Sequence, residues 1–279
     1  MSHPLRRTRT VPRWPSYTGT SHYVGTSPTY QVAVYVDPAL GNPGLQNGQD
    51  LLTDADRIAA ANSALFGSAT EPVDVIVFAI GGQTDGTGGA DHNACNFTDG
   101  GAIEVCASFG NSARVGALFE AELSECSMGG NLCGVSTGEA LSRWCAAVVG
   151  HDALADFATA PTWAKDGMPN FVDRTDPTDQ SADSTGCGMA FLSWMMSLGM
   201  KLDAIAPAMV RLGTGGTLAQ LYAALIGGSA SSAWPKFLAA AKALPPITSD
   251  DPFAAAAGAL KKSRRPPRAA PRARRPHRR

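Results

Sequence analysis

Glutamates beside a core-facing stripe are the residues of this chain best placed to do chemistry. The segment 115–126 reads VGALFEAELSEC, and its apolar residues recur at the spacing of one helix face. Glu122 and Glu125 project from the same helix side, next to that stripe. Burying an unpaired carboxylate costs several kcal/mol or raises its pKa. Such carboxylates could hold a cation or supply a general base, and Glu122, nearest the apolar stripe, is the candidate catalytic residue. In a structural alternative, Glu120 and Glu125 face solvent.

Two further residues extend this candidate site. Glu139 lies at the start of the next expected helix, and three carboxylates converging on one cleft are suited to a divalent cation. His92 is the only histidine of the first 150 residues outside the N-terminal arm, so it is the best candidate imidazole. We therefore predict Glu125, Glu139 and His92 as metal ligands, although a solvated loop histidine is the simpler interpretation of His92.

A glycine-rich stretch at 81–101 follows an expected strand and carries two more polar candidates. It matches no phosphate-binding motif and has no lysine, so nucleotide binding is not indicated. A loop of this length is usually functional or mobile. We expect a lid or substrate-binding loop in which Asp85 and Asp91 contact the substrate.

Each carboxylate also has a structural interpretation. Ser136 and Glu139 have the spacing of a capping box, in which Glu139 only satisfies the start of the helix. Glu139 and Arg143 are spaced as an ordinary i,i+4 ion pair. Glu122 would be satisfied by pairing with Arg114 or Arg143. In this alternative the residues are caps and surface charges, and the chain has no catalytic site.

The region 31–150 resembles the catalytic subdomain of zincin metallopeptidases, in particular the gluzincin branch. There, a small sheet precedes a helix carrying H-E-x-x-H, and the following helix supplies a glutamate ligand. The matching segments are 121–125, AELSE, and 138–142, GEALS. The resemblance implies a general base at Glu122 and a zinc ligand at Glu139. Ala121 and Glu125 stand where the family has its two histidines, and the spacing from Glu125 to Glu139 is short for a gluzincin.

These departures imply an altered site. We expect a metallopeptidase-like or hydrolase-like protein whose carboxylate-rich site, with an unidentified divalent cation, differs from that of a standard zinc peptidase. The alternative is a non-catalytic descendant of the fold, a pseudoenzyme that binds a peptide or small ligand in the cleft. A di-iron site would need paired E-x-x-H motifs, and a serine or cysteine triad would need more histidines.

The elements that must position these residues indicate an α+β, zincin-like fold. It has a small mixed β-sheet with packed helices, followed by an all-helical subdomain. Periodicity predicts strands at 31–37, 73–80 and 102–109, and helices at 53–66, 115–126, 136–149, 188–198, 201–212, 217–226 and 231–244. The expected units are a flexible N-terminal arm (1–30), a zincin-like subdomain (31–150), a helical subdomain (151–245), and a linker with a basic disordered tail (246–279).

The charge distribution and the cysteines indicate possible partners, disulfides and the cellular location. The net charge of −1 hides an acidic body, because ten Lys/Arg and no acidic residue follow residue 260. Such a tail is suited to a nonspecific anionic partner. Six cysteines include no C-x-x-C pair, so they are either buried free thiols or disulfides, with Cys126–Cys133 the most plausible bridge. Without a signal sequence or membrane span, we expect a soluble cytoplasmic protein. The oligomeric state stays open.

Overall fold

The computed structural model describes residues 12–97 and 101–254, and in them an α+β fold with one five-stranded mixed sheet. The sheet order is β1-β2-β3-β5-β4. The three inner strands run parallel, while β1 and β4 pair antiparallel at the two edges. The strands are β1 (His22–Thr26), β2 (Ala33–Val36), β3 (Asp74–Phe78), β4 (Ala90–His92) and β5 (Ala102–Cys106).

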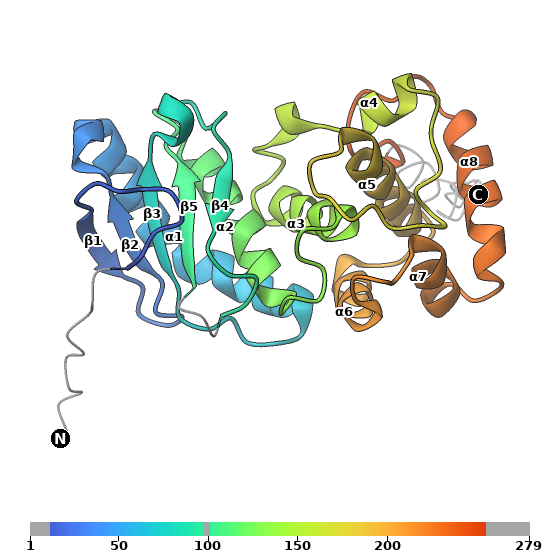
Figure 1. Cartoon of the computed structure of the whole chain (residues 1–279), viewed down its shortest axis with the longest axis horizontal. Helices are drawn as coiled ribbons and strands as arrows, with labels where there is room; N and C mark the ends of the chain where they lie inside the picture. Colours follow the sequence, from blue (N-terminus) through green and yellow to red (C-terminus); the bar gives the residue numbers. More distant parts are fainter. Residues whose placement is uncertain (1–11, 98–100, 255–279) are drawn as a thin grey trace, which may run out of the picture.

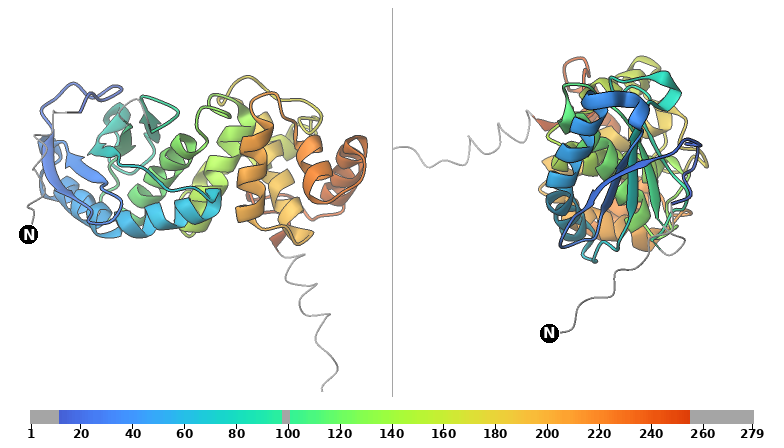
Figure 2. Two further views of the ribbon diagram at one scale, coloured as in Figure 1. Left: turned by 90° about the horizontal axis from the view of Figure 1, so that it is seen from below. Right: turned by 90° about the vertical axis from the view of Figure 1, so that its left-hand side faces the viewer.

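Two helices cover one face of this sheet. Helix α1 (Gly41–Phe66) connects β2 to β3, and α2 (Ser112–Ser127) follows β5. Side chains alternate along the strands, so Val34 of β2 packs in a core with both helices while Tyr35 points to the other face. That other face is covered by Trp14 from the N-terminal segment. Figure 2 shows α1 lying along the sheet.

The second half of the chain is helical, as predicted. Its core is built around α5, whose Phe191 and Trp194 are buried, and Trp194 stacks on Tyr222 with ring centroids 5.4 Å apart. The methionine and aromatic side chains of α5, such as Met189 and Met195, are therefore core packing. Figure 1 shows α3 between the sheet and the later helices. The α-helices are α3 (Ser136–Val149), α4 (Ala160–Lys165), α5 (Ala182–Ser197), α6 (Leu202–Leu212), α7 (Leu218–Leu225) and α8 (Ala233–Lys242). Short 3-10 helices lie at Pro38–Leu40, Ile80–Gly82, Ala155–Phe157 and Ala230–Ser232.

Several segments differ from the sequence prediction. Helix α1 begins at Gly41 and not at residue 53, because Pro43 is tolerated in a first helical turn. Gly48, within α1, allows close packing on the sheet, since a Cβ there would collide with Val36. The predicted irregular arm contains β1, and the predicted loop 81–101 contains β4. Strand β4 has only three residues, and β1 (HYVGT) contains Gly25 at a register irregularity, so neither has a clear alternating pattern.

The two ends of the described chain are tied to the body. Buried Glu104 of β5 accepts hydrogen bonds from the backbone N–H groups of Ser16 and Tyr17, at 3.0 and 2.7 Å. The start of the predicted linker packs against the helical region, where Phe253 is buried. The predicted basic tail, 261–279, lies outside the described residues. Within the described residues, no helix is long and apolar enough to cross a membrane.

Candidate functional site

Helix α2 presents its glutamates to two different environments. The side chain of Asn111 caps the helix by accepting a hydrogen bond from the Arg114 N–H at 3.3 Å. Glu120 points toward α1 and is fully buried. Glu122 and Glu125 line a cleft of about 890 Å³ between β4, α2 and α3. The predicted projection of Glu122 and Glu125 from one side of the helix is confirmed.

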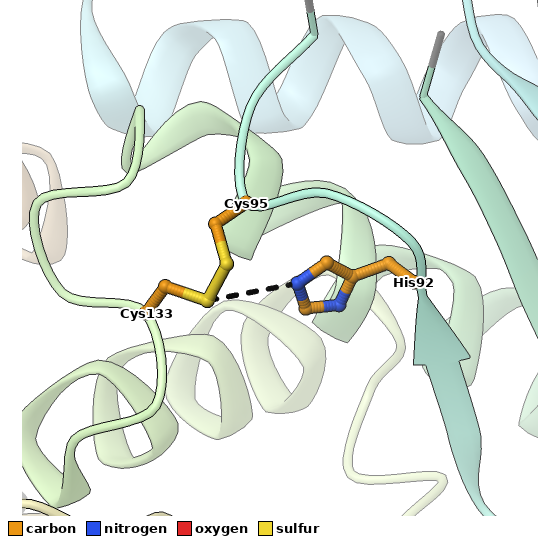
Figure 3. A group of neighbouring side chains, drawn as sticks. All are labelled: His92, Cys95 and Cys133. Carbon is orange, nitrogen blue, oxygen red and sulfur yellow. Dashed lines mark hydrogen bonds between the residues drawn. A yellow bond between two sulfur atoms is a disulfide. The ribbon is translucent and has the colours of Figure 1, made fainter. Parts of the chain in front are cut away.

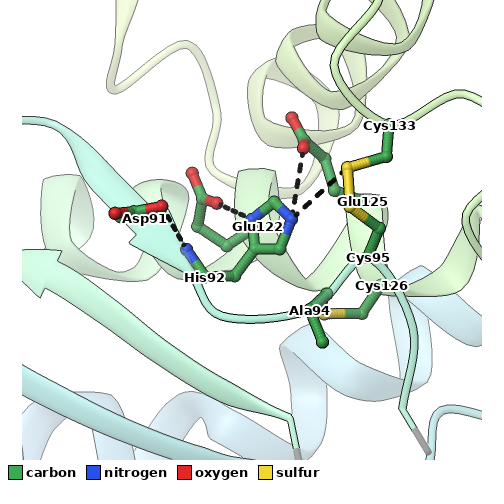
Figure 4. Close-up of a disulfide and its surroundings, with 8 residues drawn as sticks. All are labelled: Asp91, His92, Ala94, Cys95, Glu122, Glu125, Cys126 and Cys133. Carbon is green, nitrogen blue, oxygen red and sulfur yellow. Dashed lines mark hydrogen bonds and ion pairs between the residues drawn. A yellow bond between two sulfur atoms is a disulfide. The ribbon is translucent and has the colours of Figure 1, made fainter. Parts of the chain in front are cut away.

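His92 of β4 is held between these two glutamates (Figure 4). Its Nδ1 lies 2.6 Å from a carboxylate oxygen of Glu122, and its Nε2 lies 3.7 Å from one of Glu125. The three side chains are only 11–13% exposed. Nitrogen and oxygen atoms of the three residues all lie within 4.8 Å of one another. The structure thus joins a strand-borne imidazole to the helix-borne carboxylate pair.

Burial and like charge both act on this cluster. Burial raises the pKa of Glu122, and the nearby carboxylate of Glu139 raises it further. Burial also raises the pKa of Glu125 to about 8, with the charges of Glu122 and Glu139 acting in the same direction. For His92, burial opposes protonation, but the hydrogen bond and charge of Glu122 outweigh it and raise the pKa of the imidazole. Burial and neighbouring carboxylates therefore disfavour the ionised forms of Glu122 and Glu125 in this site.

Glu139 lines the same cleft but does not cap its helix. Its carboxylate accepts a hydrogen bond from Arg143 Nε at 2.6 Å, which is the i,i+4 pair expected from the spacing. The predicted capping box is wrong, because α3 begins after Val135 without a side-chain cap. Neither arginine suggested for Glu122 pairs with it, since Arg114 binds Asp156. Glu139 is thus near the cluster and not part of the closest donor set.

The two aspartates of the glycine-rich stretch have different positions. Asp91 lines the cleft, and its carboxylate accepts a hydrogen bond from the His92 backbone N–H at 2.8 Å. Asp85 is exposed and does not line the cleft. It accepts hydrogen bonds from the N–H and hydroxyl of Thr87, and these hold the pKa of Asp85 below its usual value. Of the two predicted substrate contacts, only Asp91 lies where a ligand in the cleft would reach it.

A disulfide joins Cys95, three residues after His92, to Cys133 in the loop between α2 and α3. The predicted Cys126–Cys133 bridge is wrong: Cys126 is a buried thiol that contacts the Ala94 carbonyl oxygen at 3.7 Å. The pairing joins parts of the chain 38 residues apart, which spacing alone did not indicate. Disulfides are rare in the reducing cytosol, so this bridge does not favour the cytoplasmic expectation.

The structural alternative placed Glu120 and Glu125 in solvent and is wrong for both: Glu125 is only 12% exposed, and Glu120 is fully buried. Asn62 Nδ2 of α1 donates a hydrogen bond to one of its carboxylate oxygens at 3.1 Å, and the other has no partner in the described chain. Burial raises the pKa of Glu120 to about 8. At neutral pH the side chain is mostly protonated, so it behaves as a neutral core group.

No family model matches this chain, and no curated protein or solved structure is similar enough to count as a match. The resemblance of residues 31–150 to gluzincins therefore stays a prediction from the residues. Arguments about function rest on the cleft itself.

Proposed function

We propose that this protein is hydrolase-like and binds a divalent cation at the His92–Glu122–Glu125 cluster, next to a peptide or a similar ligand in the cleft. The observation that carries the proposal is the convergence of one imidazole and two carboxylates within 4.8 Å in a cleft of about 890 Å³. Clefts of this volume are typical of ligand sites. The site differs from a standard zinc peptidase in supplying one histidine from a strand and none from the helix.

The donor set fits a cation. The His92 Nε2 and the Glu125 carboxylate are ligand types that suit Zn²⁺, Mn²⁺ or Fe²⁺, and two protein ligands leave positions open for water and substrate. The raised pKa values of Glu122 and Glu125 come from burial and from neighbouring carboxylates, and a bound cation would favour the ionised forms of both. His92 Nε2 and Glu125 face each other across the space available to the ion, while Glu122 orients the ring through Nδ1.

The chemistry of such a site follows from the residues around it. A divalent cation held there would polarise a carbonyl oxygen and acidify a bound water. Glu122, whose pKa is raised, is placed to hold or release a proton in the cleft. The Arg143 side chain, already bound to Glu139, brings a positive charge to the same lining. Such a charge is suited to a carboxylate or carbonyl group of the ligand.

A peptide is the ligand class that the cleft supports best. The lining is partly apolar, with Leu118, Phe157 and Met189. Strand β4 is the last strand of the sheet on the cleft side, and its residues 90–92 line the cleft. An extended peptide can add to such an edge through main-chain hydrogen bonds. This binding mode requires no hydrolysis, so it also supports the alternative of a non-catalytic peptide-binding protein.

Casein hydrolysis by the oxidised, cation-loaded protein tests the proposal. Glu122→Gln keeps the shape of the side chain but removes the base, so we expect hydrolysis to fall by a factor of about 10² or more. Glu120→Gln is the matched control, since it makes the same change two residues away on the other side of α2, and it should retain activity. Equal hydrolysis by both variants would contradict the assigned base.

The same proteins separate the catalytic and the binding alternatives. Stoichiometric cation and peptide binding by the wild-type protein without hydrolysis would favour the non-catalytic role. Absence of both cation binding and hydrolysis in the wild-type protein would overturn the proposed function.

A further inference from the structure

We infer that Cys95, Cys133 and His92 form a redox-gated site for a thiophilic metal ion such as Zn²⁺. In the oxidised protein the two cysteines are a disulfide, and in the reduced protein they become the ligands. The inference does not rest on the proposed function, because thiolate ligation requires neither a substrate nor a catalytic base.

The three side chains already converge on one point (Figure 3). Cys133 Sγ lies 3.9 Å from His92 Nε2, and the ligand atoms of all three residues lie within 4.8 Å of one another. Ligands bound to one zinc ion at about 2.0–2.3 Å lie roughly 3.3–3.8 Å apart in a tetrahedron. The distance from the imidazole to Cys133 is therefore already close to that of a zinc site, and only the two bonded sulfurs must move apart.

A fourth ligand and an outer-shell partner are also in place. The Glu125 carboxylate lies 3.7 Å from His92 Nε2, on the same side of the ring as the cysteine sulfurs (Figure 4). Two cysteines, one histidine and one carboxylate complete a tetrahedral set of the types zinc accepts. Glu122 binds the other ring nitrogen at 2.6 Å, as carboxylates commonly do behind a zinc-bound histidine. Nε2 is thereby the nitrogen left to face the metal.

Reduction requires only a small movement of the two sulfurs. They would separate from a bonded distance of about 2 Å to about 3.8 Å. Cys133 lies in a loop whose glycines, including Gly134, have positive φ values, and Cys95 follows the end of β4. Both cysteines are partly exposed, so a reductant can reach them. Side-chain rotation and a slight shift of the loop supply this movement.

The redox step balances with a dithiol as the reductant. Two electrons and two protons pass to the S–S bond, which breaks to give two thiols, while the dithiol is oxidised to its own disulfide. Binding of the metal ion then displaces the two thiol protons to solvent. In both states the β4 loop stays linked to the α2–α3 loop, first by the disulfide and then by the ion. What changes is whether His92 Nε2 is engaged by a metal–thiolate centre.

The remaining cysteines of the described chain do not compete for this role. Cys106, Cys126, Cys145 and Cys187 are all buried. Burial raises the pKa of Cys126 and of Cys187 to about 12, which keeps both as thiols at neutral pH. Cys126 is the nearest of the four to the cluster, so it provides a matched control.

Cobalt binding by the full chain tests the inference. Metal-free protein would be studied oxidised and after reduction with a phosphine that is then removed under inert gas. We expect one Co²⁺ per reduced chain with thiolate-to-cobalt charge-transfer absorption, and no such absorption from the oxidised protein, whose two sulfurs are bonded to each other. Zn²⁺ should displace the cobalt and bind the reduced form more than about a hundredfold tighter than the oxidised form.

The variants assign the ligands. The double variant Cys95→Ser/Cys133→Ser should lose the charge-transfer absorption, and Cys126→Ala should retain it. His92→Gln keeps the disulfide and should weaken Zn²⁺ binding by the reduced chain at least about tenfold. No charge-transfer absorption in reduced wild-type protein, or absorption that persists in the double serine variant, would overturn the inference. If reduced wild-type protein unfolds, refolding on addition of Zn²⁺ supports the site, and failure to refold contradicts it.

The experiments distinguish an incorrect redox-gated site from an incorrect proposed function, because the two ions would bind in different redox states. The proposed function concerns a cation in the oxidised protein, where both sulfurs are bonded to each other. The redox-gated site appears only after reduction and depends on Cys95 and Cys133.

Discussion

Helix α2 buries glutamates on both of its sides, but only those on the cleft side lie next to a histidine. On the α1 side, Glu120 has one hydrogen-bond partner, Asn62, and a pKa raised to about 8 by burial. On the cleft side, Glu122 and Glu125 also have raised pKa values, but they share an imidazole and face a cavity. Burial alone therefore does not mark a functional carboxylate. Convergence with a second group of different chemistry, at the wall of a cleft, separates the two sides.

The first test of this comparison, with the largest expected effect, is the contribution of Glu120 to the pH dependence of the free energy of unfolding. Its pKa is about 8 in the folded protein and 4.5 in the unfolded chain, so unfolding releases a proton between these values. The free energy of unfolding should thus fall as pH rises from 4.5 to 8, by about 5 kcal/mol from this group. Glu120→Gln should remove that part of the slope, as measured by urea unfolding across this range. Parallel pH profiles for the variant and the wild-type protein would show that Glu120 is ionised in the fold.

The next effect concerns the disulfide, which lies on the cleft side. Cys95 and Cys133 are 38 residues apart, so their bridge should stabilise the folded state by about 4 kcal/mol through the unfolded chain. We expect Cys95→Ser/Cys133→Ser to lower the free energy of unfolding by that amount, in the presence of a chelator. Thiol titration of the denatured protein should find four thiols before reduction and six after it. Six thiols without reduction would show that Cys95 and Cys133 are not joined by a disulfide.

The smallest effect is electrostatic and local to His92. Burial opposes its protonation, but Glu122 raises its pKa. Glu122→Gln should therefore lower the pKa of the His92 imidazole, as followed by NMR of the metal-free protein. Glu120→Gln should leave that pKa unchanged, because Glu120 lies on the other side of the helix. If both substitutions changed the His92 pKa equally, the glutamates on the two sides of α2 would have the same electrostatic effect on the imidazole.

Long periodic elements of the fold were predictable from the sequence. The three inner strands and most of the helices after residue 112 follow from runs of β-branched residues and from 3.6-residue spacing. The six-residue helix α4 was not predicted, and α5 begins at Ala182, before the predicted start at residue 188. Strand β4 was missed because it has only three residues, and β1 because Gly25 and a register irregularity interrupt its alternation. The N-terminal part of α1 was missed because its glycines look like turn residues, although Gly44 and Gly48 permit close packing.

The candidate site was predictable in part. The three-residue spacing placed Glu122 and Glu125 on one helix side, and the scarcity of histidine singled out His92. The pairing of Cys95 with Cys133 depends on how β4 returns beside the α2–α3 loop, which is tertiary information. The burial of Glu120 depends equally on its neighbour Asn62 in α1, which no local pattern reveals.

Calorimetric titration of Mn²⁺ or Zn²⁺ into the oxidised, metal-free protein tests the central claim most directly. We predict one ion per wild-type chain, unchanged binding in Glu120→Gln, and affinity at least about tenfold weaker in Glu125→Gln. No stoichiometric binding in the wild-type protein would contradict the claim. So would equal affinities in Glu120→Gln and Glu125→Gln, since the two sides of α2 would then be equivalent.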